Sequence, residues 1–141
     1  MSQHPGRGWF IAATVLLGIT GVLHTIGQFG PEPPELHSAL MAAREAHLPM
    51  GLGMAPSLMD ILSDLAFTMS ITFFALTAVN LILAFHADAT TALRRTAAGV
   101  SVAWLLAFDV LCYVYRIPPP LVSGIVVTIA FAIAFVRSTP R

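Results

Sequence analysis

Two ionisable side chains lie inside long apolar segments of the sequence, where they could do chemistry. Asp109 is the single carboxylate in residues 96–116, T-A-A-G-V-S-V-A-W-L-L-A-F-D-V-L-C-Y-V-Y-R, and His24 lies in the apolar run 9–29. At about 1.5 Å per helical residue, Asp109 lies about 10 Å from the Arg116 end of its run. An ionisable group at that depth in a bilayer costs about 2.5–3.5 kcal/mol unless it finds a partner. We therefore expect other helices to bring polar groups to both side chains.

A carboxylate and an imidazole in contact have two interpretations. In the first, Asp109 orients the ring, and His24 acts as a proton acceptor on a lipid or quinone-like substrate. In the second, a structural hydrogen bond between the two side chains joins the first and third long helices. The sequence does not decide between them, so we assign no catalytic residue.

Further polar residues flank these two positions. Asp109, Tyr113 and Arg116 recur at i, i+4 and i+7, which places them on one side of a helix. Asp60 follows Ser57 by three residues and fits a helix cap instead. The helices must bring the remaining polar residues to one end of the bundle, which gives a set of candidate ligand-binding residues: His24, Gln28, Asp64, Asp109, Tyr113 and Arg116.

The spacing of the ligating residue types does not favour a metal or a haem. The sequence has no H-x-x-x-H, E-x-x-H or C-x-x-C pattern, and His24 is the one histidine inside an apolar run. The single cysteine, Cys112, cannot form a disulfide within the chain. We predict no metal site and leave any cofactor unassigned.

Four helices must position these residues. The apolar runs at 9–29, 58–85, 96–116 and 118–136 are each long enough to cross a hydrocarbon core of about 30 Å. They predict an all-α, integral membrane four-helix bundle that forms a single domain over residues 1–141. In the loop 30–57, residues 35–48 are typical of a short amphipathic helix on the membrane surface or over the bundle end. The Gly- and Pro-rich segment 48–57 predicts irregular chain packed against the bundle mouth.

Composition and charge support a membrane protein and give its orientation. The chain is 57% hydrophobic and 10% charged, whereas soluble domains carry about 25% charged residues. The formal net charge is zero, so no basic surface indicates nucleic acid as a partner. The predicted topology puts Arg44 and Arg116 on one side and five arginines on the other: Arg7, Arg94, Arg95, Arg137 and Arg141. The positive-inside rule then predicts a multi-pass protein of the inner (plasma) membrane with both termini cytoplasmic.

One face of the first apolar run consists of small or polar residues. Its members follow helical spacing and are Thr14, Gly18, Gly21, Thr25 and Gln28. Small residues let helix backbones approach closely in lipid. This face therefore predicts tight helix packing, either within the chain or between copies of it.

Two stretches resemble sequences of small, uncharacterised four-span bacterial inner-membrane proteins. They are G-I-T-G-V-L-H-T at residues 18–25 and M-G-L-G-M-A-P-S-L-M-D-I-L-S-D-L-A-F-T-M-S at residues 50–70. The resemblance implies a four-span fold in an inner membrane. It implies no activity, cofactor or site residue.

The sequence leaves three functions open, with membrane lipids as partners in each. The first is a small integral membrane protein whose polar pocket near the outer membrane face binds a lipid-like or small amphipathic ligand. The second is a structural or accessory subunit, in a homo-oligomer or with another membrane protein. The third is proton-coupled transport by an oligomer. Whether the protein is an enzyme stays open.

Overall fold

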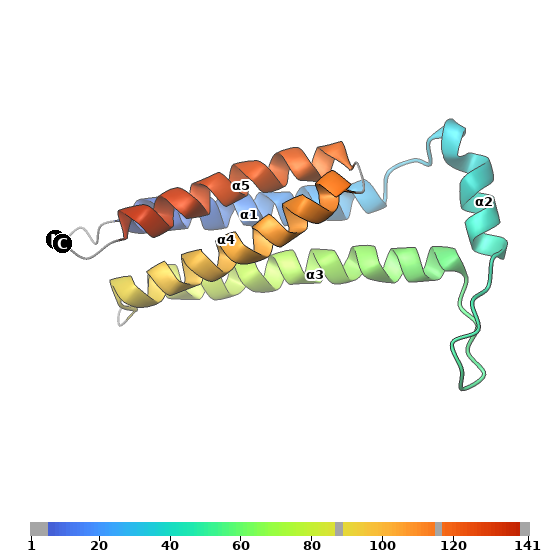
Figure 1. Cartoon of the computed structure of the whole chain (residues 1–141), viewed down its shortest axis with the longest axis horizontal. Coiled ribbons are helices and arrows are strands. Elements are labelled where there is room, and N and C mark those ends of the chain that lie inside the picture. Colours follow the sequence, from blue (N-terminus) through green and yellow to red (C-terminus); the bar gives the residue numbers. More distant parts are fainter. Residues whose placement is uncertain (1–5, 87–88, 115–116, 139–141) are drawn as a thin grey trace.

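The computed structural model is all-helical and describes residues 6–86, 89–114 and 117–138. Four long helices, α1 (Arg7–Gln28), α3 (Leu58–Phe85), α4 (Thr91–Val114) and α5 (Pro118–Arg137), lie roughly along one axis (Figure 1). A 3₁₀ turn, η1 (Pro34–Leu36), and a short helix, α2 (His37–Glu45), lie between α1 and α3. The described part of the chain has no β-strand beyond isolated bridges.

The predicted membrane architecture is confirmed by the four long helices. Each is long and apolar enough to cross a membrane, and their outward faces expose large aliphatic side chains such as Ile71, Val79 and Ile82. Lipid solvates such side chains, whereas water does not. The observed bounds match 58–85 and lie close to 9–29 and 118–136. The third long helix begins earlier than predicted, at Thr91, because the Thr90 hydroxyl accepts a hydrogen bond from the Leu93 amide at 3.1 Å.

The long helices pack unequally. α1 contacts both α3 and α5, and α4 packs mainly on α5. α3 and α4 are neighbours in sequence, but they share few contacts because they meet at the connection between them and diverge from there (Figure 1). In their shared region, Asn80 Nδ2 donates to Ser101 Oγ at 3.1 Å, and both side chains are buried.

The small-residue face of α1 lies against α3, which confirms that it is a packing face and assigns it to packing within the chain. A Cβ atom on Gly18 would lie 3.1 Å from Thr77 Cγ2, and one on Gly21 would lie 3.0 Å from the Cβ of Phe73. The two backbones therefore approach more closely than side chains would allow. Thr14, on the same face, is fully buried.

Phe73 on α3 is the centre of an aromatic cluster that joins three helices. Its ring centroid lies 5.4 Å from that of Trp104 and 5.5 Å from that of Phe108, both in edge-to-face geometry. The His24 ring of α1 lies 5.9 Å away on another side. Edge-to-face pairs add about 0.5–1.5 kcal/mol each beyond the burial of their area, so this cluster holds α1 and α4 against α3.

Two arginines close the C-terminal end of α3. Arg7 Nε donates to the Ala84 carbonyl at 3.1 Å, and Arg94 donates to the carbonyls of Leu83 at 3.0 Å and His86 at 3.4 Å. The last carbonyls of a helix have no partner within the helix, and the helix dipole favours a cation there. Arg94 is only 3% exposed. It therefore caps α3 from inside the bundle and also contributes positive charge at this end of the protein.

The segment before α3 is an exposed hairpin, so its predicted packing against the bundle mouth is wrong. Residues 47–57, which we call the 47–57 hairpin, close on themselves: the Leu48 amide donates to the Pro56 carbonyl, and the Met50 amide to the Met54 carbonyl, both at 3.0 Å. Residues 47–55 are all exposed. Because hydrogen bonds within the hairpin pair three of its amides and exposure lets water reach the rest, the segment does not need the bundle as a partner.

The start of α3 has the predicted cap. Ser57 Oγ accepts from the Asp60 amide at 3.1 Å, and an Asp60 carboxylate oxygen accepts from the Ser57 amide at 2.9 Å, which completes a capping box. The box fixes the point where the hairpin ends and the membrane-spanning helix begins.

We predict that Gly21→Leu lowers the free energy of unfolding by about 1–3 kcal/mol relative to Gly27→Leu, because only the first substitution overpacks a helix contact. Both glycines lie on α1, but a Cβ atom on Gly27 meets nothing within 4 Å. Thermal and denaturant unfolding in detergent micelles measures the difference. Equal stability of the two variants would contradict the close α1–α3 approach.

Candidate functional site

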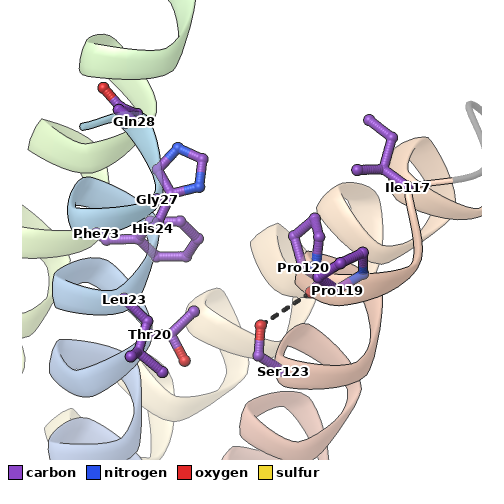
Figure 2. A pocket seen from close by; sticks show the side chains of 10 residues that line it. All are labelled: Thr20, Leu23, His24, Gly27, Gln28, Phe73, Ile117, Pro119, Pro120 and Ser123. Atoms are coloured by element: carbon purple, nitrogen blue, oxygen red, sulfur yellow. Dashed lines mark hydrogen bonds between the residues drawn. The ribbon is translucent and has the colours of Figure 1, made fainter. Parts of the chain in front are cut away.

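A cavity of about 460 Å³ lies between α1 and the N-terminal end of α5. Figure 2 shows α1 side chains on one side of this space and residues of the α5 end on the other. Phe73 of α3 contributes one wall. The lining residues are Thr20, Leu23, His24, Gly27, Gln28, Phe73, Ile117, Pro119, Pro120 and Ser123.

The cavity exists because α1 and α5 pack closely at one end only. Near the termini, the Phe10 and Phe131 ring centroids lie 6.0 Å apart, and a Cβ atom on Gly6 would collide with Ser138. At the other end, α5 begins with prolines, which suit a first helical turn since its amides have no intrahelical acceptor. The faces of Pro119 and Pro120 stand across the space from His24 (Figure 2).

His24 is the polar group best placed to meet a ligand. Its Nε2 lies 3.3 Å from the Ala66 carbonyl oxygen, and because a carbonyl can only accept, Nε2 carries the proton. In the neutral ring the other nitrogen, Nδ1, is then an acceptor, and no residue that the structure describes forms a hydrogen bond with it. Figure 2 shows the ring leaning into the space in front of α5.

Gln28 lies one turn further along α1 and forms a hydrogen bond with the same carbonyl of α3, that of Ala66. Its Nε2 donates to the Ala66 oxygen at 3.1 Å and to Ser70 Oγ at 2.8 Å. Its Oε1 is buried and has no partner among the described residues. His24 and Gln28 are thus brought together as predicted, and α3 holds both in place.

Asp109 lies elsewhere, between α4 and α5. One carboxylate oxygen accepts from the Thr128 hydroxyl at 2.8 Å, and the other is buried without a partner among the described residues. The residue is 8% exposed and lies against Gly124, where a Cβ atom would collide with its carboxylate. Gly124 is therefore the position that makes room for the carboxylate on α5.

The expected His24–Asp109 contact is not formed between these two described residues. Each has a different hydrogen-bond partner, Ala66 for His24 and Thr128 for Asp109, and Asp109 does not line the cavity. Both interpretations of the pair, the oriented base and the structural bond between the two side chains, are therefore corrected. The reason is the rotation of α4 about its own axis. The face of α4 that carries Asp109 packs on α5, while the side that carries Phe108 packs on α3.

The other candidate residues lie apart from the cavity. Tyr113 is 74% exposed, and Asp64 is exposed on α3. Arg116 lies outside the described residues. Of the six candidates, His24 and Gln28 therefore line the cavity. Asp64, Asp109 and Tyr113 do not.

Sequence reasoning missed the residues that complete the cavity and the surroundings of Asp109. Phe73, Pro119 and Pro120 form cavity walls, and Thr128 is the partner of Asp109. Thr128 had one available signal, since it is one of few polar residues in the last apolar run. The cavity walls had no such signal in the sequence, because apolar residues occur on every face of these helices.

No group of three or more His, Cys, Asp or Glu side chains gathers in the described ranges 6–86, 89–114 and 117–138. No protein-family model, curated protein or solved structure matches the chain. The fold defines the class: an all-helical, multi-pass membrane protein with four spanning helices.

We predict that Thr128→Val destabilises the protein by about 1–3 kcal/mol, because Asp109 then loses its hydroxyl donor in a buried position. Thr128→Ser is the matched control, since it keeps the hydroxyl. Unfolding of both variants in the same detergent provides the comparison. A valine variant as stable as the serine variant would show that the hydrogen bond contributes nothing.

Proposed function

We propose that the protein binds a lipid-like or other small amphipathic molecule in the cavity between α1 and α5, with His24 as its polar contact. The observation that carries the proposal is the His24 ring on the wall of a mostly apolar cavity, with Nδ1 of the neutral ring available as an acceptor. Ligand sites in proteins are typically mostly apolar concavities of about 300–1,000 Å³ with few polar groups.

The other polar donors of the cavity lining are already engaged, and among its polar acceptors Gln28 Oε1 is buried and without a partner in the described chain. Thr20 Oγ1 donates to the Leu16 carbonyl at 3.0 Å, and Ser123 Oγ donates to the Pro120 carbonyl at 3.1 Å. The Gln28 amide group donates to α3. His24 is therefore the group that a ligand hydroxyl, amine or protonated acid meets first, while Leu23, Phe73 and Ile117 offer contact to its hydrocarbon part.

The position of the cavity suits a ligand that enters from the bilayer. It lies between two membrane-spanning helices, and its lining residues other than Phe73 of α3 lie in the C-terminal half of α1 and at the N-terminal end of α5. A molecule there can keep its hydrocarbon part at the depth of the lipid chains and its polar part near the membrane boundary. Binding rather than catalysis is proposed, because His24 has no carboxylate partner in the described chain.

The proposed orientation puts both termini in the cytoplasm of a cell with an inner (plasma) membrane, so the cavity lies near the outer face. It is supported by Gly6 and Ser138, which lie side by side, and by Arg7, Arg94 and Arg137 at that same end. Such an excess of arginine favours the cytoplasmic side.

We predict that a photoactivatable fatty alcohol, which carries a diazirine in its chain and a hydroxyl donor at its end, labels the walls of the cavity in nanodiscs. Gly27→Leu fills free space at the cavity wall without a clash and should reduce labelling of peptides 20–28 and 117–123 to background. Gly8→Leu is the matched control, since Gly8 also lies on α1 and an added Cβ there meets nothing within 4 Å.

In the same assay, His24→Leu should weaken labelling about ten-fold, as expected for the loss of a hydrogen bond worth about 1.5 kcal/mol. Labelling that is equal in the Gly27→Leu and Gly8→Leu variants would refute the cavity as the binding site. Labelling that depends on Gly27 but not on His24 would refute the role of the imidazole.

The orientation has its own test. We expect alkaline phosphatase fused to the C-terminus to be inactive and green fluorescent protein fused there to fluoresce, since each reporter works on one side of an inner membrane. The reverse pattern would place the cavity near the cytoplasmic face and would leave the binding proposal unchanged.

A further inference from the structure

The tip of the 47–57 hairpin presents one leucine to its surroundings. Leu52 is 96% exposed, and it lies between Gly51 and Gly53. Met50 and Met54 are exposed next to it, and hydrogen bonds across the hairpin hold them level with each other. Residues 46–59 include no Asp, Glu, Lys or Arg, so the tip is apolar and carries no formal charge.

The backbone of the tip maintains this exposure. Gly51, Leu52 and Gly53 all have positive φ, at 84°, 52° and 77°. Glycine adopts this region freely, whereas leucine does so at a cost. Leu52 is the one non-glycine residue with positive φ in the described chain, and a glycine there would relieve the strain but lose the side chain. Strained residues of this kind cluster where a side chain has a role.

The hairpin lies at the level of a membrane boundary. In Figure 1 it runs across the bundle axis at the level where α3 begins, and it extends sideways beyond the outline of the four long helices. α3 is a membrane-spanning helix that starts at Leu58, directly after the hairpin. A segment at this level and beside the bundle overhangs the bilayer rather than the bundle.

We propose that the hairpin tip inserts into the boundary between lipid headgroups and acyl chains, with Leu52 deepest and the two methionines above it. Transfer of these side chains from water to lipid is favourable. The cross-hairpin bonds satisfy the amides of Leu48, Met50 and Met54, and the remaining backbone groups keep to the headgroup zone, where water is present.

The neighbouring segment of η1 and α2 lies at about the same level of the bundle axis (Figure 1) but differs from the hairpin in charge. Arg44 pairs with Glu32, and His37 lies 3.8 Å from the same carboxylate. These side chains are exposed. The charged α2 segment therefore suits water, whereas the uncharged hairpin suits lipid.

Spin labelling of the full chain in phosphatidylcholine–phosphatidylglycerol liposomes tests the proposal. In a Cys112→Ala background, a nitroxide is attached to Leu52→Cys or, as the aqueous control, to His37→Cys. The ratio of collision rates with oxygen and with a water-soluble nickel chelate reports depth. We expect a ratio severalfold higher at position 52 than at position 37.

A label on Met54→Cys gives a second reading, since it probes the same hairpin without changing the strained residue. We expect an intermediate ratio there. Equal ratios at positions 37, 52 and 54 would overturn the proposal. Low access of both reagents to position 52 would also overturn it, because a protein partner rather than lipid would then cover the tip.

Discussion

The close approach of α1 to α3 at Gly18 and Gly21 determines where the other parts of the bundle can lie. It brings His24 and Gln28 within hydrogen-bond distance of the Ala66 carbonyl and places Phe73 behind them. α5 then packs on α1 near the termini and on α4 along its length. Because α5 does not follow α1 to its end, the cavity opens between them. The site is thus a consequence of helix packing rather than of a dedicated loop.

Lipid offers no hydrogen bonds, so polar side chains inside the bundle must find partners on neighbouring helices. Gln28 and Ser70 join α1 to α3, Asn80 and Ser101 join α3 to α4, and Asp109 and Thr128 join α4 to α5. Each pair connects a different pair of helices. His24 differs from these residues, because one of its ring nitrogens serves the bundle and the other faces the cavity.

The number of helices, most of their bounds, the packing face of α1 and the Ser57–Asp60 cap could be predicted, because apolar length, helical spacing and capping chemistry are local. The partner of each face could not. In lipid both the interior and the exterior of a bundle are apolar, so hydrophobicity does not tell which side of α4 faces inward. The sequence therefore could not show that Asp109 meets Thr128 and not His24. The hairpin was mispredicted because its composition does not show that its backbone pairs with itself.

The central claim is that the cavity beside His24 holds an amphipathic molecule, and native mass spectrometry of the unmodified protein, released directly from its own membrane, tests it most directly. The account predicts a small molecule with a hydrocarbon part, bound in a ratio of one to the chain and retained at collision energies that strip the surrounding lipid. A bare chain at the energy where the bundle still keeps its folded charge states would contradict the account.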